Sequence, residues 1–425
     1  MSKLSADGSQ LLSSTYVGGS GDDGVNLGTL DYNYGDAYRG EIALDAAGDV
    51  YVASSTQSAN FPVTGSSPTP TGALSAVAFR LPSNLSALTW SRAISGSGED
   101  CGNGVQISST GDVYVAGGTS SSNLNFGFGH MQTYLGGRDG FVIRLSGTDG
   151  STLSGTYVGQ NTYDQVYFVQ LDIQDQVYVL GQSDAPYAIT ANYGVPNSGQ
   201  FVRKYNSTLQ SLSWTTMIGA GTGEVEISPT AFLVSDCYDI YLSGWGGQVN
   251  SDNSQAIFSS SNNFPTTSDA YQDNTDGNNF YIAVLGPDAS FLKYATYFGG
   301  VVSSNNHVDG GTSRFDKGGN IYHAACASCG SSQTGFTTTP GAWSETSNST
   351  NCNMAVFKFD LEKIEPLVSI PNTILCANQP VLFNNTTAAA NTFYWEFGDG
   401  NNSTEVSPFH QYATGGTYTV MLVVG

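Results

Sequence analysis

The sequence predicts an all-β protein, in which a five-bladed β-propeller closed by its N-terminal strand precedes a smaller β-sandwich. Two observations support this prediction. A polar turn followed by a short apolar stretch, Gly-Asp-Val-Tyr-Val-Ala at residues 48–53, occurs in five related copies, with its tyrosine at positions 51, 114, 178, 241 and 322. Repetition at such intervals is typical of radial or stacked architectures. The 52 glycines and 12% aromatic residues, beside only 11% charged residues, are typical of many short strands joined by glycine turns.

Each repeat contains four short predicted strands, named A to D. In the first repeat these are residues 41–45, 50–53, 77–81 and 88–96. Four consecutive strands joined in this way form a meander sheet, which is the blade of a propeller. The chain starts on a D-type strand at residues 11–19, and the fifth repeat ends after its C strand at residues 355–359. We therefore expect the N-terminal strand to complete the fifth blade, which would remove the exposed sheet edges.

The repeats resemble the SBBP β-propeller repeat of secreted bacterial proteins. The motifs that carry the resemblance are Ser-Thr-Tyr-Val-Gly-Gly (14–19), Gly-Asp-Val-Tyr-Val-Ala (48–53), Phe-Val-Ile-Arg-Leu (141–145) and Phe-Pro-Thr-Thr (264–267). The third and fourth repeats depart from the pattern, because they lack the glycine before the hairpin strand. The resemblance implies a propeller domain over residues 1–362.

A different pattern follows from residue 366 to residue 425. It contains Trp-Glu-Phe-Gly-Asp-Gly at 395–400, then Pro408, His410 and Tyr412, and finally an alternating strand-like run at 416–424. This segment resembles a PKD domain, which is an immunoglobulin-like β-sandwich. The resemblance implies an extracellular spacer or carbohydrate-adjacent module without catalysis of its own. Because the sequence stops near the end of the sandwich, we expect the chain to be part of a longer polypeptide.

The chain is strongly acidic, with a formal net charge of −22 and a pI near 4.1. An acidic surface repels phosphate backbones, so nucleic acid is not expected as a partner. No apolar run approaches the length of a membrane span, so membrane insertion is not expected either. The residues at the N-terminus lack the apolar core of a signal peptide.

The repeat pattern predicts one acidic residue in the turn between the D strand and the A strand of each repeat. The assigned residues are Asp36, Asp100, Asp164, Glu224 and Asp309. On one face of a propeller, five carboxylates could surround the mouth of the central channel and bind a hard cation such as calcium. The alternative is that each acid accepts hydrogen bonds from its own turn and has no other role.

Three of the six cysteines, Cys326, Cys329 and Cys352, lie close together in the sequence. The Cys-x-x-Cys spacing could indicate zinc or a redox pair, but only His323 and Cys352 lie nearby as further soft ligands. We expect a disulfide from Cys352 to Cys326 or Cys329 instead, because the composition is typical of extracellular proteins. His323 replaces an apolar strand residue and is predicted to be a satisfied core histidine.

Two tryptophans are candidates for stacking on sugars: Trp245, which lies between glycines, and Trp343, in the loop bounded by cysteines. The sequence contains no nucleophile motif such as Gly-x-Ser-x-Gly, so no catalytic residue is assigned. We expect a non-catalytic adhesion or recognition module that binds surface proteins or polysaccharide.

Taken together, the two resemblances imply a secreted or cell-surface protein of the Bacteroidetes type, including those exported by type IX secretion and associated with gliding motility. Two alternatives to a recognition module remain. One is a carbohydrate-active enzyme with acids at the channel mouth, and the other is a structural spacer in a surface fibre.

Overall fold

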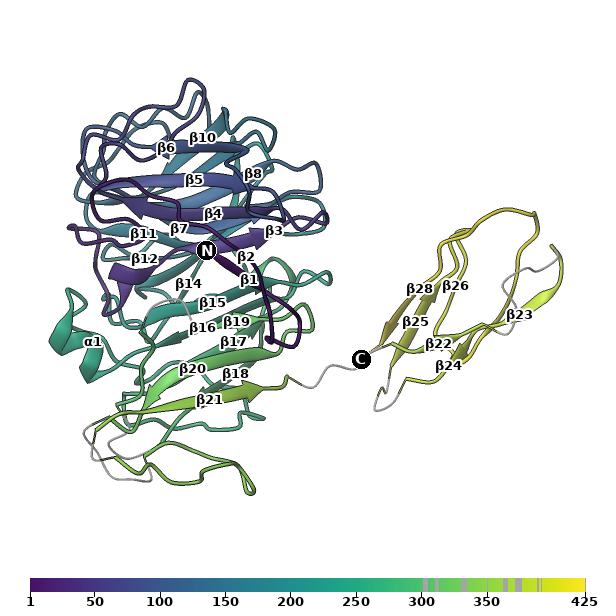
Figure 1. The fold of residues 1–425 in the computed structure, drawn as a ribbon. Coiled ribbons are helices and arrows are strands. Elements are labelled where there is room, and N and C mark those ends of the chain that lie inside the picture. Colours follow the sequence, from purple (N-terminus) through teal and green to yellow (C-terminus); the bar gives the residue numbers. More distant parts are fainter. Residues whose placement is uncertain are drawn as a thin grey trace. The chain divides into compact units, whose positions relative to one another are not determined.

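The protein was analysed as a computed structural model that describes residues 1–425 except 301–304, 310–312, 330–334, 350, 362–365, 371–376, 388–389, 391 and 425. The chain divides into two compact units, Met1–Phe359 and Asp360–Gly425. The first unit contains repeated antiparallel sheets, coloured purple to green along the chain in Figure 1.

Four of these sheets have four strands each, joined in sequence order. The first sheet consists of β3 (Glu41–Leu44), β4 (Val50–Thr56), β5 (Ser75–Leu81) and β6 (Trp90–Ile94). The second consists of β7 (Asp100–Ile107), β8 (Val113–Thr119), β9 (Asp139–Leu145) and β10 (Thr152–Val158). The third consists of β11 (Asp164–Leu171), β12 (Val177–Ser183), β13 (Gln200–Tyr205) and β14 (Leu212–Ile218). The fourth consists of β15 (Ser228–Val234), β16 (Ile240–Trp245), β17 (Phe280–Leu285) and β18 (Leu292–Phe298).

The fifth sheet has three strands among the described residues: β19 (Arg314–Phe315), β20 (Ile321–Ala327) and β21 (Asn353–Phe359). Short helices occur in connecting segments: η1 (Asp36–Tyr38), α1 (Gln248–Asn253) and η2 (Pro287–Ala289). The first strands of successive sheets lie against one another. The repeated four-strand units predicted from the sequence are therefore present, as blade-like sheets.

The hairpin turn of each repeat is held by a side chain five residues before the start of the strand formed by the repeated stretch. In the first sheet, the Asp45 carboxylate accepts hydrogen bonds from the backbone N–H groups of Ala47 and Asp49, both at 2.9 Å. Asp172 accepts the equivalent pair of bonds in the third sheet. This is the Asx-turn geometry that fixes the strand register.

The N-terminal strand does not pair as predicted in the part of the chain that the structure describes. We expected residues 11–19 to complete the fifth sheet beside β21. Instead, β2 (Leu11–Ser14) pairs with β1 (Ser2–Leu4) in a hairpin of its own. Pairing β2 with β1 costs less loop-closure entropy than pairing β2 with the edge of the fifth sheet, because β1 and β2 are neighbours in the sequence.

Among its described residues, the second unit has seven short strands: β22 (Val368–Ser369), β23 (Pro380–Leu382), β24 (Asn384–Asn385), β25 (Phe393–Glu396), β26 (Asn402–Ser403), β27 (Phe409–Gln411) and β28 (Met421–Val424). They form three small antiparallel sheets. Its core is aromatic: Trp395 is fully buried and packs against Phe383 and Phe397. The His410 ring stacks on Phe397 at 4.1 Å and contacts the Asp399 carboxylate at 2.8 Å, so this motif histidine has a structural role.

Candidate functional site

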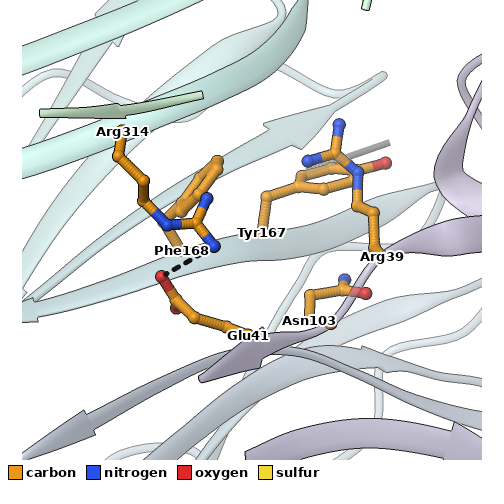
Figure 2. A pocket seen from close by; sticks show the side chains of 7 residues that line it. Arg39, Glu41, Asn103, Tyr167, Phe168 and Arg314 are labelled. Carbon is orange, nitrogen blue, oxygen red and sulfur yellow. Dashed lines mark ion pairs between the residues drawn. The ribbon is translucent and has the colours of Figure 1, made fainter. Parts of the chain in front are cut away.

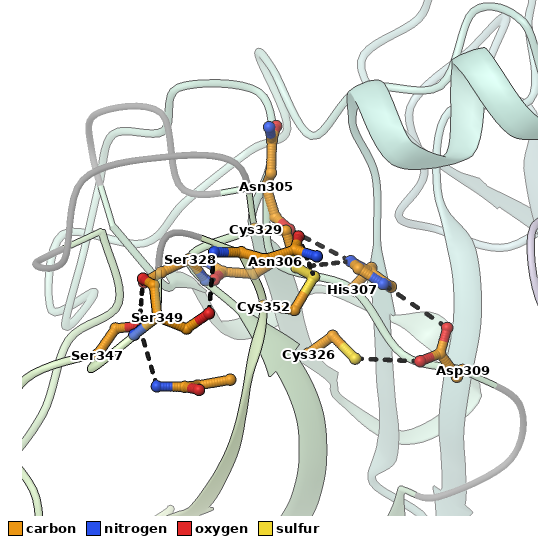
Figure 3. Close-up of a disulfide and its surroundings, with 12 residues drawn as sticks. Asn305, Asn306, His307, Asp309, Cys326, Ser328, Cys329, Ser347, Ser349 and Cys352 are labelled. Carbon is orange, nitrogen blue, oxygen red and sulfur yellow. Dashed lines mark hydrogen bonds and ion pairs between the residues drawn. A yellow bond between two sulfur atoms is a disulfide. The ribbon is translucent and has the colours of Figure 1, made fainter.

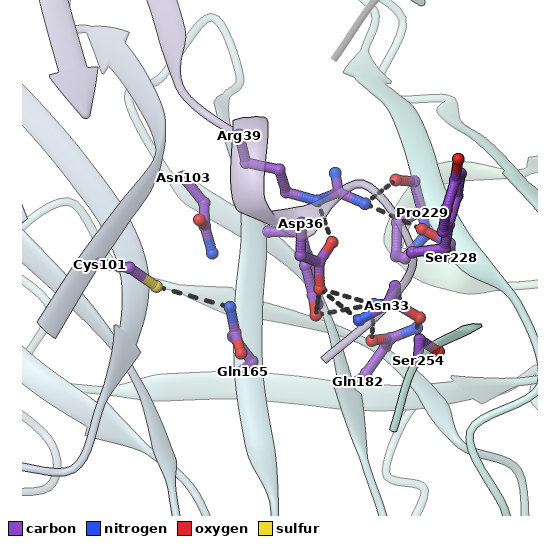
Figure 4. A network of polar contacts seen from close by, with 12 residues as sticks. Asn33, Asp36, Arg39, Cys101, Asn103, Gln165, Gln182, Ser228, Pro229 and Ser254 are labelled. Carbon is purple, nitrogen blue, oxygen red and sulfur yellow. Dashed lines mark hydrogen bonds and ion pairs between the residues drawn. The ribbon is translucent and has the colours of Figure 1, made fainter. Parts of the chain in front are cut away.

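The centre of the first unit is occupied by a segment of the chain, residues 26–39, which we call the central segment. It carries η1, and its Asp36 side chain is fully buried. The Asp36 carboxylate forms an ion pair with Arg39 (Figure 4). It also accepts a hydrogen bond from the Tyr167 hydroxyl of β11 at 2.7 Å. Arg39 then donates to the Ser228 hydroxyl of β15 at 2.9 Å. One buried ion pair thus connects the central segment to the third and fourth sheets.

Further contacts anchor the same segment in the third and fourth repeats. The Tyr32 ring stacks on Tyr163 with centroids 3.6 Å apart, and its hydroxyl donates to Asp184 at 3.0 Å. The Tyr34 backbone N–H donates to the Asn250 side chain of α1 at 2.7 Å. Because these partners lie in the connections around the third and fourth sheets, the central segment is held inside the unit instead of forming a surface loop.

The space left beside the central segment is small. A cavity of about 10 Å³ is lined by Arg39, Gly40, Glu41, Asn103, Tyr167, Phe168 and Arg314, as Figure 2 shows. That volume is about the room that a single water molecule needs. Glu41 of β3 and Arg314 of β19 form an ion pair at 3.9 Å across it, so the first and fifth sheets approach each other there. Burial raises the pKa of Glu41, while Arg314 and the Val105 N–H lower it.

Two of the predicted acids, Asp100 and Asp164, are buried inside their own turns. Asp100 accepts hydrogen bonds from the Gly96 N–H at 2.9 Å and the Ser121 hydroxyl at 3.0 Å. Asp164 accepts from the Gln160 N–H and the Tyr187 hydroxyl, both at 2.7 Å. Burial raises the pKa of each carboxyl to about 6. These contacts are those of turn-holding residues.

Two other predicted acids, Asp36 and Glu224, are not at the equivalent position. The residue equivalent to Asp100 in the first repeat is Asp23, which accepts from the Gly19 N–H at 2.7 Å. In the fourth repeat it is Glu226, which accepts from the Ala220 N–H at 3.0 Å and whose pKa burial raises to about 7. The sequence does contain a signal that marks Asp23 as the equivalent of Asp100. Asp23 follows Gly19 by four residues, as Asp100 follows Gly96.

The structure does not bring the five predicted acids together. Among the described residues, two groups of three side chains could share a metal ion: His307, Asp309 and Cys326, and His307, Cys329 and Cys352. Asp309 is the one predicted acid that belongs to such a group. We call His307, Asp309 and Cys326, with the neighbouring disulfide, the His307 cluster (Figure 3).

The backbone fixes two members of the His307 cluster opposite each other. His307 and Cys326 exchange both backbone hydrogen bonds, at 3.0 and 2.9 Å, so they form an antiparallel pair with side chains on one face. Asp309 lies two residues beyond His307. Its carboxylate accepts a hydrogen bond from the Cys326 thiol at 3.0 Å and lies 3.6 Å from His307 Nε2. Sequence reasoning missed His307, because the bridge that places it beside Cys326 is a tertiary feature.

Cys352 forms a disulfide with Cys329, which is one of the two partners expected for it. The bond spans 23 residues and leaves Cys326 as a thiol. Burial, together with the hydrogen bond to Asp309 and the charge of that carboxylate, raises the pKa of this thiol to about 11. The thiol of the resting protein is therefore protonated at neutral pH and is a poor nucleophile.

His323, which was considered as a zinc ligand, is a core residue as predicted. Its ring nitrogens contact the hydroxyls of Ser313 at 2.6 Å and Ser243 at 3.2 Å, and the ring stacks on Phe357. Burial lowers its pKa to about 3, so the ring is neutral.

The two candidate tryptophans differ. Trp343 is fully exposed, as a sugar-stacking residue would need to be. Trp245 is only 1% exposed, so this candidate is not accessible for stacking on a sugar. Trp245 ends β16 and packs against Tyr34 of the central segment and against the His307 ring, 5.7 Å away. The burial of Trp245 depends on a segment more than 200 residues earlier, which its flanking glycines do not reveal.

Comparison with known proteins identifies one part of the chain. A family model of the PKD domain matches residues 364–425, so the C-terminal segment is a PKD domain, as the sequence predicted. No curated protein matches the sequence. The PKD domain and the disulfide indicate an extracellular setting. Within the described residues, no helix has the length and apolar character needed to span a bilayer.

Three solved structures show weak similarity to the chain. The acylaminoacyl peptidase of Pyrococcus horikoshii has 7% identity and a TM-score of 0.33 over 88% of this chain, which covers 52% of the peptidase chain. A protein of unknown function from Dyadobacter fermentans has 9% identity and a TM-score of 0.34, over 92% of this chain and 98% of that one. The extracellular domain of the putative one-component system BT4673 from B. thetaiotaomicron has 8% identity and a TM-score of 0.22. That match covers 90% of this chain and 59% of the BT4673 chain. The chain thus spans about half of the peptidase, and similarity at these scores transfers no activity.

Proposed function

We propose that the protein is a non-catalytic extracellular recognition module of a larger cell-surface protein, which binds surface proteins or polysaccharide. The observation that carries this proposal is the filled centre of the first unit. The central segment leaves room for about one water molecule, whereas a substrate needs a pocket of roughly 300–1,000 Å³. The carboxylates of Asp100 and Asp164 also accept hydrogen bonds from backbone N–H groups of their own turns, which argues against an acid–base pair at the channel mouth.

We further propose that the first unit is a five-bladed propeller of the SBBP type that is closed by its N-terminal strand. Glu41 and Arg314 already join the inner strands of the first and fifth sheets. The apolar residues Leu11 and Leu12 of β2 are exposed, and so are Met354 and Val356 of β21. Pairing β2 with β21 would cover these side chains and complete the fifth blade.

A ligand would then bind on loops at the surface, where Trp343 offers a fully exposed ring. A tryptophan face stacks on the apolar face of a sugar, and the same ring can anchor a protein contact. The net charge of −22 favours neutral or cationic partners over polyanions.

Binding to a glycan array and to intact surface proteins tests this function. We expect specific binding that Trp343→Ala weakens by about tenfold or more, since a stacking anchor contributes roughly 1–3 kcal/mol by analogy with base stacking. Phe258→Ala is the matched control, because Phe258 is also an exposed loop aromatic. Polysaccharide hydrolysis that is lost in Asp100→Asn would overturn the proposal in favour of an enzyme. A complete lack of binding would favour a structural spacer.

A further inference from the structure

The His307 cluster contains an arrangement that its hydrogen bonds alone do not explain. His307 Nδ1 lies 3.2 Å from the Asn305 carbonyl oxygen, which can only accept a hydrogen bond. Nδ1 therefore carries the proton, and Nε2 of the neutral ring presents a lone pair. That lone pair lies 3.6 Å from a carboxylate oxygen of Asp309, which is also an acceptor. A cation placed between these two acceptors would interact favourably with both of them.

From this geometry we propose that His307 Nε2, the Asp309 carboxylate and the Cys326 thiolate bind a divalent cation of the zinc class. The three ligand atoms all lie within 4.8 Å of one another. One nitrogen, one oxygen and one sulfur form a donor set that suits Zn²⁺ and that calcium or magnesium does not favour. The site is distinct from the ring of acidic turns, of which it includes only Asp309.

The distances fit such an ion after a small adjustment. Two ligands about 2.1 Å from a tetrahedral zinc are about 3.4 Å apart, close to the 3.6 Å between His307 Nε2 and Asp309. The Cys326 sulfur lies 3.0 Å from the other carboxylate oxygen because a proton joins them. When zinc replaces that proton, the sulfur and oxygen separate by roughly half an ångström. The Asp309 side chain, which is 50% exposed, can rotate to allow this.

The surroundings hold the ligands in place before the ion binds. The His307 ring is packed between Tyr34, 5.4 Å away, and Trp245, 5.7 Å away, and Val308 points into the core on the opposite side of the strand. The Asn305 carbonyl fixes the ring tautomer, as outer-shell partners of metal-binding histidines do. The disulfide keeps Cys329 and Cys352 out of the ligand set. Three protein ligands leave a fourth position, on the side of exposed Asp309, for water or an external ligand.

Binding would proceed with loss of the Cys326 proton, since the thiolate is the ligand. The test uses the full chain, stripped with a chelator and kept without reductant, with Cys326 shown to be a free thiol by alkylation and mass spectrometry. We expect Zn²⁺ to bind with one equivalent in calorimetry, and Co²⁺ to give the near-ultraviolet absorption of a thiolate–cobalt bond. Calcium, titrated in parallel, should not compete.

Variants decide whether this cluster is the site. Cys326→Ser should remove the cobalt–thiolate absorption and weaken Zn²⁺ binding by about 100-fold, and Asp309→Asn should weaken it by about 10- to 100-fold. Cys237→Ser is the control, because Cys237 is another free thiol and is exposed; it should bind Zn²⁺ as the parent does. Asp309→Asn keeps the test valid if other variants misfold, since its side chain is half exposed. No Zn²⁺ binding by the parent, or unchanged cobalt absorption in Cys326→Ser, would overturn the proposal.

Discussion

The second and fifth sheets of the first unit come from the same sequence repeat but have different surroundings. In the second sheet, every residue of β8 and almost every residue of β9 is buried, because other sheets cover both faces. In the fifth sheet, β21 alternates between exposed residues and buried or partly buried ones, and Met354 and Val356 are 81% and 71% exposed. The repeat therefore encodes the strands, while the neighbours decide which side chains are enclosed.

The acidic residues at or before the start of the second and fifth sheets differ in burial in the same way. Asp100 of the second sheet is fully buried, and its carboxylate is occupied by its own turn and by Ser121. Asp309, before the fifth sheet, is half exposed and contacts a thiol and an imidazole instead. A repeated acid that its neighbours enclose holds a turn, whereas one beside an incompletely covered sheet remains available to bind a ligand.

The largest expected effect concerns the two cores. Phe141→Ala in β9 removes a fully buried ring and should lower the free energy of unfolding by about 3–5 kcal/mol. Val356→Ala in β21 removes a side chain that is 71% exposed, so with β21 uncovered the change should be less than about 0.5 kcal/mol, whereas the proposed closure by the N-terminal strand should raise it to about 1 kcal/mol or more. Urea unfolding of both variants measures the difference. Similar losses in the two variants would mean that another segment covers β21 in solution, as closure by the N-terminal strand requires.

The second comparison uses the two acids. Asp100→Ala leaves the Gly96 N–H and the Ser121 hydroxyl without their acceptor, so we expect a loss of about 2–3 kcal/mol. Asp309→Ala, in metal-free protein, should cost less than about 0.5 kcal/mol, since its side chain is half exposed. Thermal and urea unfolding of the two variants give the answer. A large loss in metal-free Asp309→Ala would show that this acid is structural too.

The sequence predicted those features that depend on short spacings. The repeated hairpin stretches form strands, and the motif from Trp395 onward belongs to a PKD domain. Cys352 forms a disulfide with one of the two cysteines expected as its partner. The prediction failed where an insertion or a distant contact decides the outcome. Asp36 was assigned to a repeated turn, but the inserted segment that carries it crosses the centre of the unit and forms a buried ion pair with Arg39.

The His307 cluster was beyond sequence reasoning for a similar reason. His307 and Cys326 are 19 positions apart by number and meet only because their backbones pair. The glycine neighbours of Trp245 do not reveal its burial, because its packing partner Tyr34 belongs to the first repeat. Contacts between sheets depend on the lengths of the loops that join them, which local patterns do not report.

The smallest expected effect is a pH dependence that originates in a complete sheet. Asp139 opens β9 and is fully buried; one carboxylate oxygen accepts from the Leu135 N–H at 2.9 Å, and the other has no hydrogen-bond partner among the described residues. Burial raises its pKa from 3.8 to about 7, and the charge of Asp164 acts in the same direction. Between pH 4 and pH 7, roughly, the folded protein then binds more protons than the unfolded chain.

The free energy of unfolding should therefore fall as the pH rises through this window and level off above it. Asp139→Asn removes the buried charge and keeps an acceptor for Leu135, so we expect it to stabilise the protein by about 1 kcal/mol at pH 7.5 and to have little effect at pH 4. Asp309→Asn is the matched control, because it makes the same substitution at a half-exposed side chain that precedes the fifth sheet. Urea unfolding of the metal-free variants at the two pH values measures both. A gain for Asp139→Asn that is equal at pH 4 and pH 7.5 would show that the buried charge is not the cause, and that enclosure by neighbouring sheets does not perturb the acids of the complete repeats.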